Sequence, residues 1–395
     1  MDRRNFLKTL SSAATAASIA AGGSSLAEPA PGPDFKTKHL IWIINGNGCR
    51  KKEYYENPEI CPNTVALGKE SFVFEEDHNY TVSEHGNSWT ELITGNENQS
   101  GVPLNPTPPA YIRKASGDKS TNYWWVNGVS YYRQWRFSEK YFSYHPDYNA
   151  EAYRPVSLTA THVFNAHFNQ RRSPAQVVAQ EMPDMGMTAA EKKMMEEFIE
   201  DCFKRQLYDI TGLKNKVIPR DPFLGDAFGL QIIPHILTAF KPRMLIFQQV
   251  GHDTGHGAGG YLRQQTGYPE YEKVARATDE QIGSIVRFIK NDPYFSKNTA
   301  IVVRPEFGRD DEVNLYGEVH HSSGYYYCAR SASMWWGPDF KVGKSDMLVN
   351  RLDAVPTITK IFGVDAVHAN GRVLTPAFKE DIASQLPPYR SYTQA

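Results

Sequence analysis

The sequence predicts an α/β protein, namely a three-layer α/β/α sandwich with a mostly parallel sheet. Continuous apolar runs at residues 39–44, 244–250 and 299–303 have the length and composition of strands that are buried on both faces. Segments with helical periodicity at residues 223–240 and 271–290 alternate with the last two runs, as in a doubly wound sheet. Polar, glycine-rich segments follow these runs, and such sheets bind ligands at the carboxyl ends of their strands.

The amino-terminal part of the predicted domain holds two strands and a short helix. Residues 39–44 end at the tight turn Asn45-Gly46-Asn47-Gly48, and residues 71–74 form a second, shorter strand. Residues 88–94 are typical of a helix with Ser88 as its N-cap and Gly95 as its C-cap.

Residues 96–219 form a predicted large insertion. Two helices in it begin at Ser173-Pro174 and at the capping box of Thr188 and Glu191. An aromatic cluster in the insertion is either a platform for sugar rings or a partner protein, or the small core of the insertion, and we favour the core. The cluster consists of Tyr123, Trp124, Trp125, Tyr131, Tyr132 and Trp135.

The carboxyl-terminal part closes the domain. The apolar run at residues 333–336 is a candidate strand, and residues 353–362 are a candidate helix. Asp279, in the helix at residues 271–290, is expected to orient the loop that follows residues 244–250.

The amino terminus predicts export from a bacterial cytoplasm. Residues 3–8 read Arg-Arg-Asn-Phe-Leu-Lys, a twin-arginine pattern, and small residues at 25–27 offer a cleavage site. The weakly apolar stretch between them is too short to span a membrane stably. We therefore expect a signal peptide at 1–27, a linker at 28–38, a domain at 39–395, and a periplasmic or secreted protein that is not an integral membrane protein.

Composition excludes some partner classes and leaves the disulfide pattern open. The net charge of −1 gives no reason to expect nucleic acid or an anionic membrane as a partner. Export permits disulfides, and Cys49 and Cys61 are close enough in sequence for a loop-closing bridge, whereas Cys202 and Cys328 suggest no pairing. No Cys-x-x-Cys pair is present, which disfavours a thiolate zinc site.

Two strand ends carry side chains that bind metals. Residues 250–257 read Val-Gly-His-Asp-Thr-Gly-His-Gly, and residues 304–309 read Arg-Pro-Glu-Phe-Gly-Arg, followed by His320-His321. Imidazoles and carboxylates suit zinc, iron or manganese, which predicts one metal site at the sheet edge. The alternative is a polar loop whose histidines cap the adjacent helix.

Four pieces of the chain together resemble the alkaline phosphatase/sulfatase superfamily, and within it a twin-arginine-exported, sulfatase-like branch with a Glu-Phe-Gly-Arg motif. The pieces are residues 40–46, 89–95, 251–257 and 353–363, the last reading Asp-Ala-Val-Pro-Thr-Ile-Thr-Lys-Ile-Phe-Gly. The resemblance implies an alkaline phosphatase-like fold and metal-dependent hydrolysis of a phosphate or sulfate ester.

The chain departs from the family pattern at the expected site. Asn45 stands where the family has its first metal-binding aspartate, and His85 stands where the family has its nucleophile. Glu306-Phe307 replaces an Asp-His pair. The metal ligands that the resemblance implies here are Asn45, His252, Asp253, His256, Glu306, His320 and His321, of which His320 and His321 are alternatives for one position.

The roles of three site residues stay open at this point. Glu306 is either a ligand or an acid buried against Arg304 or Arg309. Arg309 is either a catalytic clamp on a substrate oxyanion or a salt-bridge partner of Asp310 or Asp311. His85 is either a further ligand or itself a nucleophile. Four nearby hydroxyls remain candidate nucleophiles: Thr81, Ser83, Ser88 and Thr90.

These observations predict an exported hydrolase of a small-molecule or glycan ester. Because the usual nucleophile is missing, direct attack by metal-bound water is the expected mechanism. The expected cofactor is a divalent metal, zinc above all, with iron, manganese or calcium as alternatives. The rival hypothesis is a non-catalytic scaffold that binds a glycan or a protein partner through the aromatic residues of the insertion.

Overall fold

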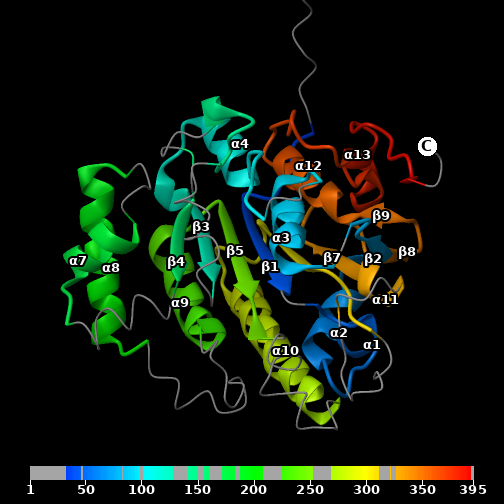
Figure 1. Ribbon diagram of the computed structural model, residues 1–395, viewed down its shortest axis with the longest axis horizontal. Coiled ribbons are helices and arrows are strands. Elements are labelled where there is room, and N and C mark those ends of the chain that lie inside the picture. Colours follow the sequence, from blue (N-terminus) through cyan, green and yellow to red (C-terminus); the bar gives the residue numbers. More distant parts are fainter. Residues whose placement is uncertain are drawn as a thin grey trace, which may run out of the picture. The chain divides into compact units, whose positions relative to one another are not determined.

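A sheet of nine strands forms the centre of the described part of the chain (Figure 1). Its strand order is β4-β3-β5-β1-β6-β7-β2-β8, and β9 pairs with β2. The strands are β1 (His39–Asn45), β2 (Phe72–His78), β3 (Tyr123–Asn127), β4 (Val156–Thr159), β5 (Met244–Gln249), β6 (Thr299–Pro305), β7 (Arg330–Trp336), β8 (Gly343–Ser345) and β9 (Val349–Asn350).

This computed structural model describes a large part of the chain, and the predicted signal peptide lies outside that part. The described residues are 33–45, 48–81, 83–97, 101–127, 140–148, 153, 155–159, 171–182, 187–207, 225–251, 268–310, 321 and 326–392. None of the helices within them is both long and apolar enough to cross a membrane.

Helices lie on both faces of the sheet. They are α1 (Lys51–Tyr54), α2 (Pro62–Lys69), α3 (His85–Thr94), α4 (Pro108–Ser116), α7 (Pro174–Glu181), α8 (Ala189–Lys204), α9 (Gly225–Phe240), α10 (Tyr268–Asn291), α11 (Tyr326–Ala329), α12 (Ala354–Ile361) and α13 (Glu380–Ala383). With the sheet between its two helical layers, the chain has the three-layer α/β/α architecture that the sequence predicted.

The centre of the sheet is parallel because its strands are apolar on both faces. All seven residues of β1 are buried, and β1 pairs in parallel with β5 on one side and β6 on the other. Strand β7 runs antiparallel between β6 and β2, so β2 points the same way as β1. The carboxyl ends of β1, β2, β5 and β6 therefore lie on one edge of the sheet.

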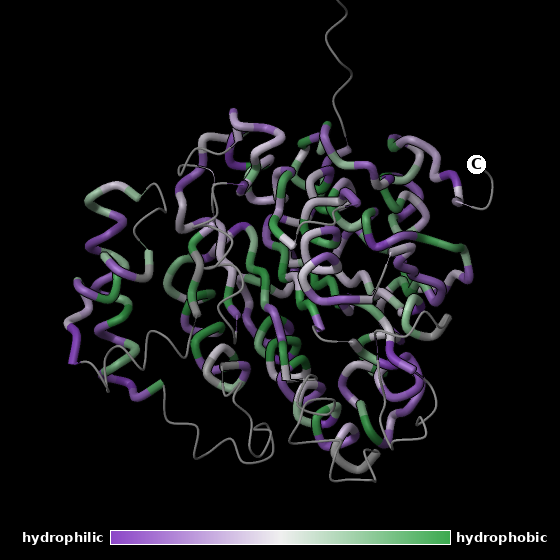
Figure 2. Tube along the Cα trace, viewed as in Figure 1, coloured by the Kyte–Doolittle hydropathy of each residue, from purple (hydrophilic) through white to green (hydrophobic). Residues whose placement is uncertain are grey.

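Successive side chains of β1 point alternately into two hydrophobic cores. Ile41 and Ile43 pack into the core that α2, α9 and α10 cover, whereas Leu40, Trp42 and Ile44 pack into the core under α3, α4 and α12. Figure 2 shows the central strands coloured as hydrophobic and hydrophilic residues spread over the helices around them. Burial on both faces fixes the strand register, because a shift by one residue would exchange the two sets.

The stretch that we expected to be an insertion contributes to the main sheet. Strand β3 pairs in parallel with β5, and β4 pairs in parallel with β3. Tyr123, Trp124 and Trp125 are fully buried in β3, so they belong to the core of the domain and cannot form a platform for sugars. Tyr131, Tyr132 and Trp135 lie outside the described residues.

Local signals placed most helix ends correctly. Ser173 and Thr188 each form a capping box at the start of α7 and α8, and Gly95 ends α3 in the left-handed conformation with φ 68°. The predicted N-cap at Ser88 is wrong. Helix α3 begins three residues earlier, because the Glu84 side chain accepts hydrogen bonds from the free backbone N–H groups of Gly86 and Asn87.

One further expectation needs correction. None of the four cysteines forms a disulfide and all four are buried, so Cys49 and Cys61 form no bridge. The Asp279 carboxylate accepts hydrogen bonds from the backbone N–H groups of Asn63 and Thr64 and thus anchors the start of α2 on α10. The loop after β5 lies outside the described residues, so the role of Asp279 in orienting it stays a prediction.

Candidate functional site

Three strand ends and the start of α3 meet at the carboxyl edge of the sheet. Asn45 ends β1, Glu306 follows β6, and the segment after β2 leads to His85, the first residue of α3. The backbone N–H of Glu306 donates to the Asn45 carbonyl at 3.2 Å. Parallel pairing of β1 with β6 thus brings together two residues that the sequence placed in one site.

His85 and Glu306 form a close pair in this edge. Nδ1 of His85 lies 3.4 Å from each carboxylate oxygen of Glu306. The Glu306 side chain is fully buried, whereas the His85 side chain is 21% exposed. A buried carboxylate is costly unless charge or hydrogen bonds compensate it. The pair therefore presents one imidazole that solvent reaches and a carboxylate behind it that orients the ring.

His321 is the third member of the cluster. Its ring centroid is 4.6 Å from that of His85. The ring centroid of Phe307 lies 4.6 Å from that of His321 and 5.3 Å from that of His85. Nδ1 of His321 lies 3.0 Å from the backbone carbonyl of Ser83. A carbonyl can only accept, so Nδ1 carries the proton and Nε2 carries the lone pair. Histidines that bind metals are commonly held by such a bond on the other nitrogen.

Asn45 adds an unusual polar group. Its side chain is fully buried, and within the described residues neither its amide oxygen nor its amide nitrogen has a hydrogen-bond partner. Burying a polar atom in this way costs about 1–3 kcal/mol. A bound water molecule, a bound ion or a residue outside the described ranges would complete the hydrogen bonding of this amide.

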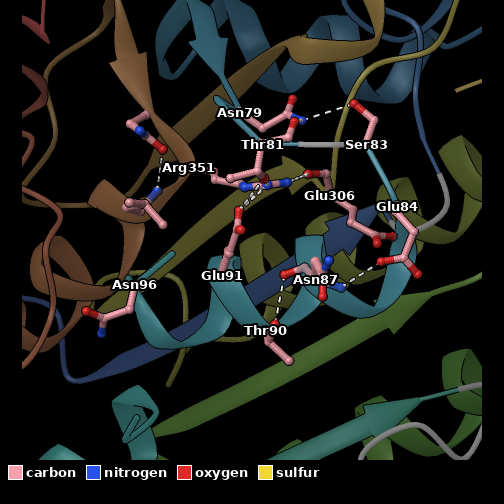
Figure 3. A network of polar contacts seen from close by, with 12 residues as sticks. Asn79, Thr81, Ser83, Glu84, Asn87, Thr90, Glu91, Asn96, Glu306 and Arg351 are labelled. Carbon is pink, nitrogen blue, oxygen red and sulfur yellow. Dashed lines mark hydrogen bonds and ion pairs between the residues drawn. The ribbon is translucent and has the colours of Figure 1, made fainter. Parts of the chain in front are cut away.

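An ion-pair network lies beside Glu306 (Figure 3). The Arg351 guanidinium contacts the Glu91 carboxylate and the Thr81 hydroxyl, and its Nη1 donates to the backbone carbonyl of Glu306 at 3.4 Å. Arg351 and Glu91 are both about 1% exposed. Burial lowers the pKa of Arg351 to about 10, although the adjacent Glu91 carboxylate favours its charged form.

Sequence reasoning missed Glu91 and Arg351. Glu91 lies inside the recognised motif at residues 89–95, and Arg351 stands two residues before the motif at residues 353–363. A charged residue in the middle of a buried helix motif is the signal that could have marked Glu91, because such residues are almost never fully buried unless they are paired.

A second buried ion pair settles one of the alternatives for Glu306. Arg304 forms a two-pronged ion pair with Asp77, in which Nε donates to Oδ2 at 2.9 Å, and Nη1 donates to the Pro305 carbonyl at 2.7 Å. Arg304 is therefore the partner of Asp77, and the interpretation that Glu306 is an acid buried against Arg304 is wrong.

Arg309 lies near the site but is almost completely buried. Its guanidinium stacks over the Tyr271 ring at 5.2 Å from the centroid, and only 1% of the residue is exposed. Its neighbour Asp310 accepts a hydrogen bond from the Cys328 thiol at 2.9 Å. Asp311 lies outside the described residues, and the choice between an oxyanion clamp and a salt bridge for Arg309 stays a prediction.

Three of the four candidate hydroxyl nucleophiles are engaged in hydrogen bonds to the protein. Thr81 donates to Glu91 at 2.7 Å, Ser83 donates to the Cys328 carbonyl at 2.8 Å, and Thr90 donates to the Asn87 carbonyl at 2.8 Å. Ser88 is completely buried inside α3. His85, whose side chain is 21% exposed, stands at the position that the sequence resemblance assigns to the nucleophile.

Four of the predicted metal ligands lie outside the described residues: His252, Asp253, His256 and His320. The structure does describe what holds the start of their loop, since the Asp226 carboxylate accepts from the backbone N–H groups of Val250 and Gly251 at 2.9 and 2.8 Å. Within the described ranges alone, no three His, Cys, Asp or Glu side chains are grouped so that they could hold a metal ion.

The architecture of the described part of the chain is similar to that of solved alkaline phosphatase-like α/β structures. No sequence model of a protein family matches the chain, and no curated protein matches it by sequence. Solved structures do match. They include the phosphonate monoester hydrolase SpPMH from Silicibacter pomeroyi (14% identity, 90% of this chain and 78% of that chain, TM-score 0.52) and a mutant of the alkaline phosphatase PafA (10% identity, 89% and 100%, TM-score 0.55).

A third structure with the same fold is the phosphonate monoester hydrolase of Agrobacterium radiobacter (10% identity, 89% of this chain and 78% of that chain, TM-score 0.50). At such low identities a structural likeness establishes the fold alone. The fold of this chain is accordingly alkaline phosphatase-like, which is the fold that the four sequence pieces predicted.

Proposed function

We propose that this protein is an exported, metal-dependent hydrolase of phosphate or sulfate esters. The observation that carries the proposal is the convergence of His85, Glu306 and His321 beside the buried amide of Asn45, at the carboxyl edge of an alkaline phosphatase-like sheet. The proteins that share the fold include phosphatases and phosphonate monoester hydrolases by their names, which supports an ester of this class as the substrate.

The described residues supply part of the ligand set that we propose for a divalent metal. Glu306 supplies a buried carboxylate, Nε2 of His321 has its lone pair directed away from the Ser83 carbonyl, and the Asn45 amide oxygen has no hydrogen-bond partner among the described residues. Mixed nitrogen and oxygen donors suit zinc, manganese or iron. His252, Asp253 and His256 would complete the ligand shell, and His320 is the alternative to His321 for one position. Such a metal lowers the pKa of water and polarises an ester oxygen.

Electrostatics also argues for a bound cation. Glu84 precedes His85, and its carboxylate already occupies the amide groups at the start of α3 that would otherwise favour a substrate anion. Glu306 adds a second carboxylate next to His85. A phosphate or sulfate group would be repelled by both acids, so positive charge from a bound metal, from Arg309 or from both is needed to bind it.

We propose that His85 is the residue that transfers a proton during hydrolysis. It is exposed enough to meet a substrate, and Glu306 orients its ring. An imidazole in this position is suited to take a proton from attacking water or to give one to the leaving oxygen. We propose that Arg309 stabilises the negative charge that develops on the substrate oxygen.

Hydrolysis assays with and without metal test the proposal. Protein stripped with a chelator and then reloaded with zinc, manganese, iron or calcium is assayed with p-nitrophenyl phosphate, p-nitrophenyl sulfate and a p-nitrophenyl phosphonate monoester. We expect turnover only after reloading and strong loss in His85→Ala. The matched control is Glu75→Gln, which removes an exposed carboxylate that pairs with Lys344 on β8. Absence of turnover with every metal and every substrate would overturn the proposal.

A second candidate is a non-catalytic protein on the same scaffold that binds a glycan or a partner protein. The engagement of the Thr81, Ser83 and Thr90 hydroxyls in structural hydrogen bonds favours it. It predicts metal binding without turnover, so elemental analysis together with the assays separates the two functions.

A further inference from the structure

A cavity of about 560 Å³ lies at the opposite edge of the sheet from the candidate active site. His39 begins β1, Arg243 directly precedes β5, and Asn122 directly precedes β3, and all three line the cavity. The seven residues of β1 separate this edge from Asn45 by about 20 Å at the usual rise per residue. The cavity is therefore distinct from the carboxyl-edge site.

The charged lining of the cavity is mainly positive. Lys38, Lys241 and Arg243 face one acid, Asp34. Arg243 pairs with Asp118, whereas within the described residues the two lysines have no carboxylate partner. Lys38 donates to the Phe35 carbonyl at 2.9 Å. Two ammonium groups near one cavity favour an anion inside it.

Aromatic rings hold two of these cations in place. The Lys241 ammonium lies 4.4 Å from the Tyr294 ring centroid, and the Arg243 guanidinium lies 5.1 Å from that of Phe362. Tyr294 is in turn fixed by His39, whose Nε2 lies 3.2 Å from the tyrosine hydroxyl. Such contacts reduce the conformational entropy that the cations would lose on binding a ligand.

The backbone at Lys241 is a second, independent observation. Lys241 follows the last residue of α9 and has φ 46°, a left-handed conformation in which glycine is normally favoured. A bulky residue there costs of order 1 kcal/mol, and residues held in this way cluster at ligand sites. Its side chain thereby reaches the ring of Tyr294 beside the cavity.

The local field agrees with this charge pattern. The pKa of His39 is lowered by burial and by the positive charges of Arg243 and Lys241, although a hydrogen bond to the Pro242 carbonyl acts in the opposite direction. The carbonyl accepts from Nδ1, so the neutral ring accepts from Tyr294 through Nε2. His39 thus contributes shape and no charge to the cavity.

From this geometry we propose that the amino-edge cavity is a second binding site, for an organic anion that carries a phosphate, phosphonate or sulfate group. Lys38, Lys241 and Arg243 would bind the oxyanion. Apolar side chains of Phe35, Ile361 and Phe362 would contact the organic part, and the volume lies in the range of small-molecule sites. An inorganic ion alone would leave this apolar wall unused.

Calorimetric titration with phenylphosphonate tests the site, since its carbon–phosphorus bond is not an ester. Lys241→Gly removes the ammonium and relieves the left-handed backbone, so the variant should fold at least as well as the wild type. We expect Lys241→Gly to weaken binding about tenfold, as the loss of one charge-assisted contact does. Lys38→Gln should weaken it as well, and uncharged benzyl alcohol should bind far more weakly.

Two further proteins distinguish this site from the carboxyl edge. Glu306→Gln should bind phenylphosphonate at the amino edge as the wild type does, and Lys193→Ala, which removes an exposed charge on α8, should do the same. The proposal is overturned if Lys241→Gly and Lys38→Gln bind as tightly as the wild type, if the wild type does not bind phenylphosphonate, or if benzyl alcohol binds equally well.

Discussion

Nδ1 of His85 lies 3.4 Å from both carboxylate oxygens of Glu306, although 221 residues separate the two along the chain. The contact exists because α3 follows β2 and Glu306 follows β6, and both strands point to the same edge. A partly exposed imidazole with a buried carboxylate behind it is the part of the site on which the proposed chemistry depends.

Glu306→Gln is expected to remove activity while it preserves the fold. Glutamine keeps the volume of the side chain but loses the charge that would bind a metal and orient His85. Replacing a group that only supports a metal ligand lowers metal affinity or activity by roughly 10–100-fold. Replacing a ligand itself should therefore lower kcat/KM by at least about 100-fold. Metal content by elemental analysis should fall in parallel.

Circular dichroism and thermal unfolding provide the control for Glu306→Gln. A variant that unfolds at the wild-type temperature but has lost metal and turnover supports the role of Glu306 in the site. Retention of full activity by a folded Glu306→Gln protein would contradict it.

The Arg351–Glu91 pair is expected to be a strong stabilising contact. Both side chains are about 1% exposed, so Arg351→Met leaves the Glu91 charge buried without its partner. Such a change costs about 3–5 kcal/mol in the free energy of unfolding. The double variant Arg351→Met/Glu91→Met should cost clearly less than the sum of the two single variants, as measured by urea unfolding.

The exposed pair Lys344–Glu75 is the matched control for this ion pair. The Lys344 side chain is 70% exposed, so Lys344→Met should change the free energy of unfolding by less than about 1 kcal/mol. Similar costs for Lys344→Met and Arg351→Met would show that burial does not strengthen the Arg351–Glu91 contact.

Gly95 is expected to tolerate no side chain. It ends α3 with φ 68°, and a Cβ atom there would lie 2.9 Å from Cβ of Val355 and 3.0 Å from Cβ of Ala369. Gly117 ends α4 with φ 69° and has nothing within 4 Å of the same position. Gly117→Ala should therefore cost only the backbone strain of about 1 kcal/mol. Gly95→Ala should cost about 1–3 kcal/mol more by denaturant unfolding. Equal costs would contradict the packing argument.

The strand pattern made the fold predictable from the sequence. Runs such as residues 39–44, 244–250 and 299–303 are apolar on both faces, and only strands inside a parallel sheet need that. The strands of residues 96–219 were harder to recognise, because β3 is only five residues long and its tryptophans also fit a separate small core. Strand β4, of four residues, gives a still weaker signal.

The candidate site was predictable only in part. Asn45 and Glu306 could be predicted because they follow the ends of two neighbouring parallel strands, and the carboxyl ends of such strands lie at the same edge of the sheet. That relationship depends on the backbone alone. The Arg304–Asp77 and Arg351–Glu91 pairs join segments more than 200 residues apart, and no local pattern encodes which charges meet. Ser88 was predicted to be the N-cap of α3, but Glu84 has that role. The Glu84 side chain accepts the capping hydrogen bonds from the backbone N–H groups of Gly86 and Asn87.

Asp353 makes the stability of the protein depend on pH through the carboxyl-terminal segment. Its buried carboxylate accepts hydrogen bonds from the hydroxyls of Tyr389 and Tyr392 at 2.8 and 2.6 Å and from the backbone N–H groups of Asn350 and Arg372. Burial nevertheless raises the pKa of Asp353 to about 6, because these bonds compensate only part of the desolvation cost.

The raised pKa fixes the sign of the effect. The folded state binds this proton more tightly than the unfolded chain, whose pKa is about 3.9. The stability that Asp353 contributes is therefore fully present below about pH 4 and is lost as pH rises through about 6, a change of about 3 kcal/mol. Asp353→Asn has no such proton, so the free energy of unfolding of the variant minus that of the wild type should rise by this amount over the same interval. Urea unfolding at a series of pH values measures that difference.

Tyr392→Phe removes a hydrogen-bond donor to the ionised carboxylate of Asp353, which should shift the pH interval to higher pH. A difference between Asp353→Asn and the wild type that does not change with pH would refute the assignment.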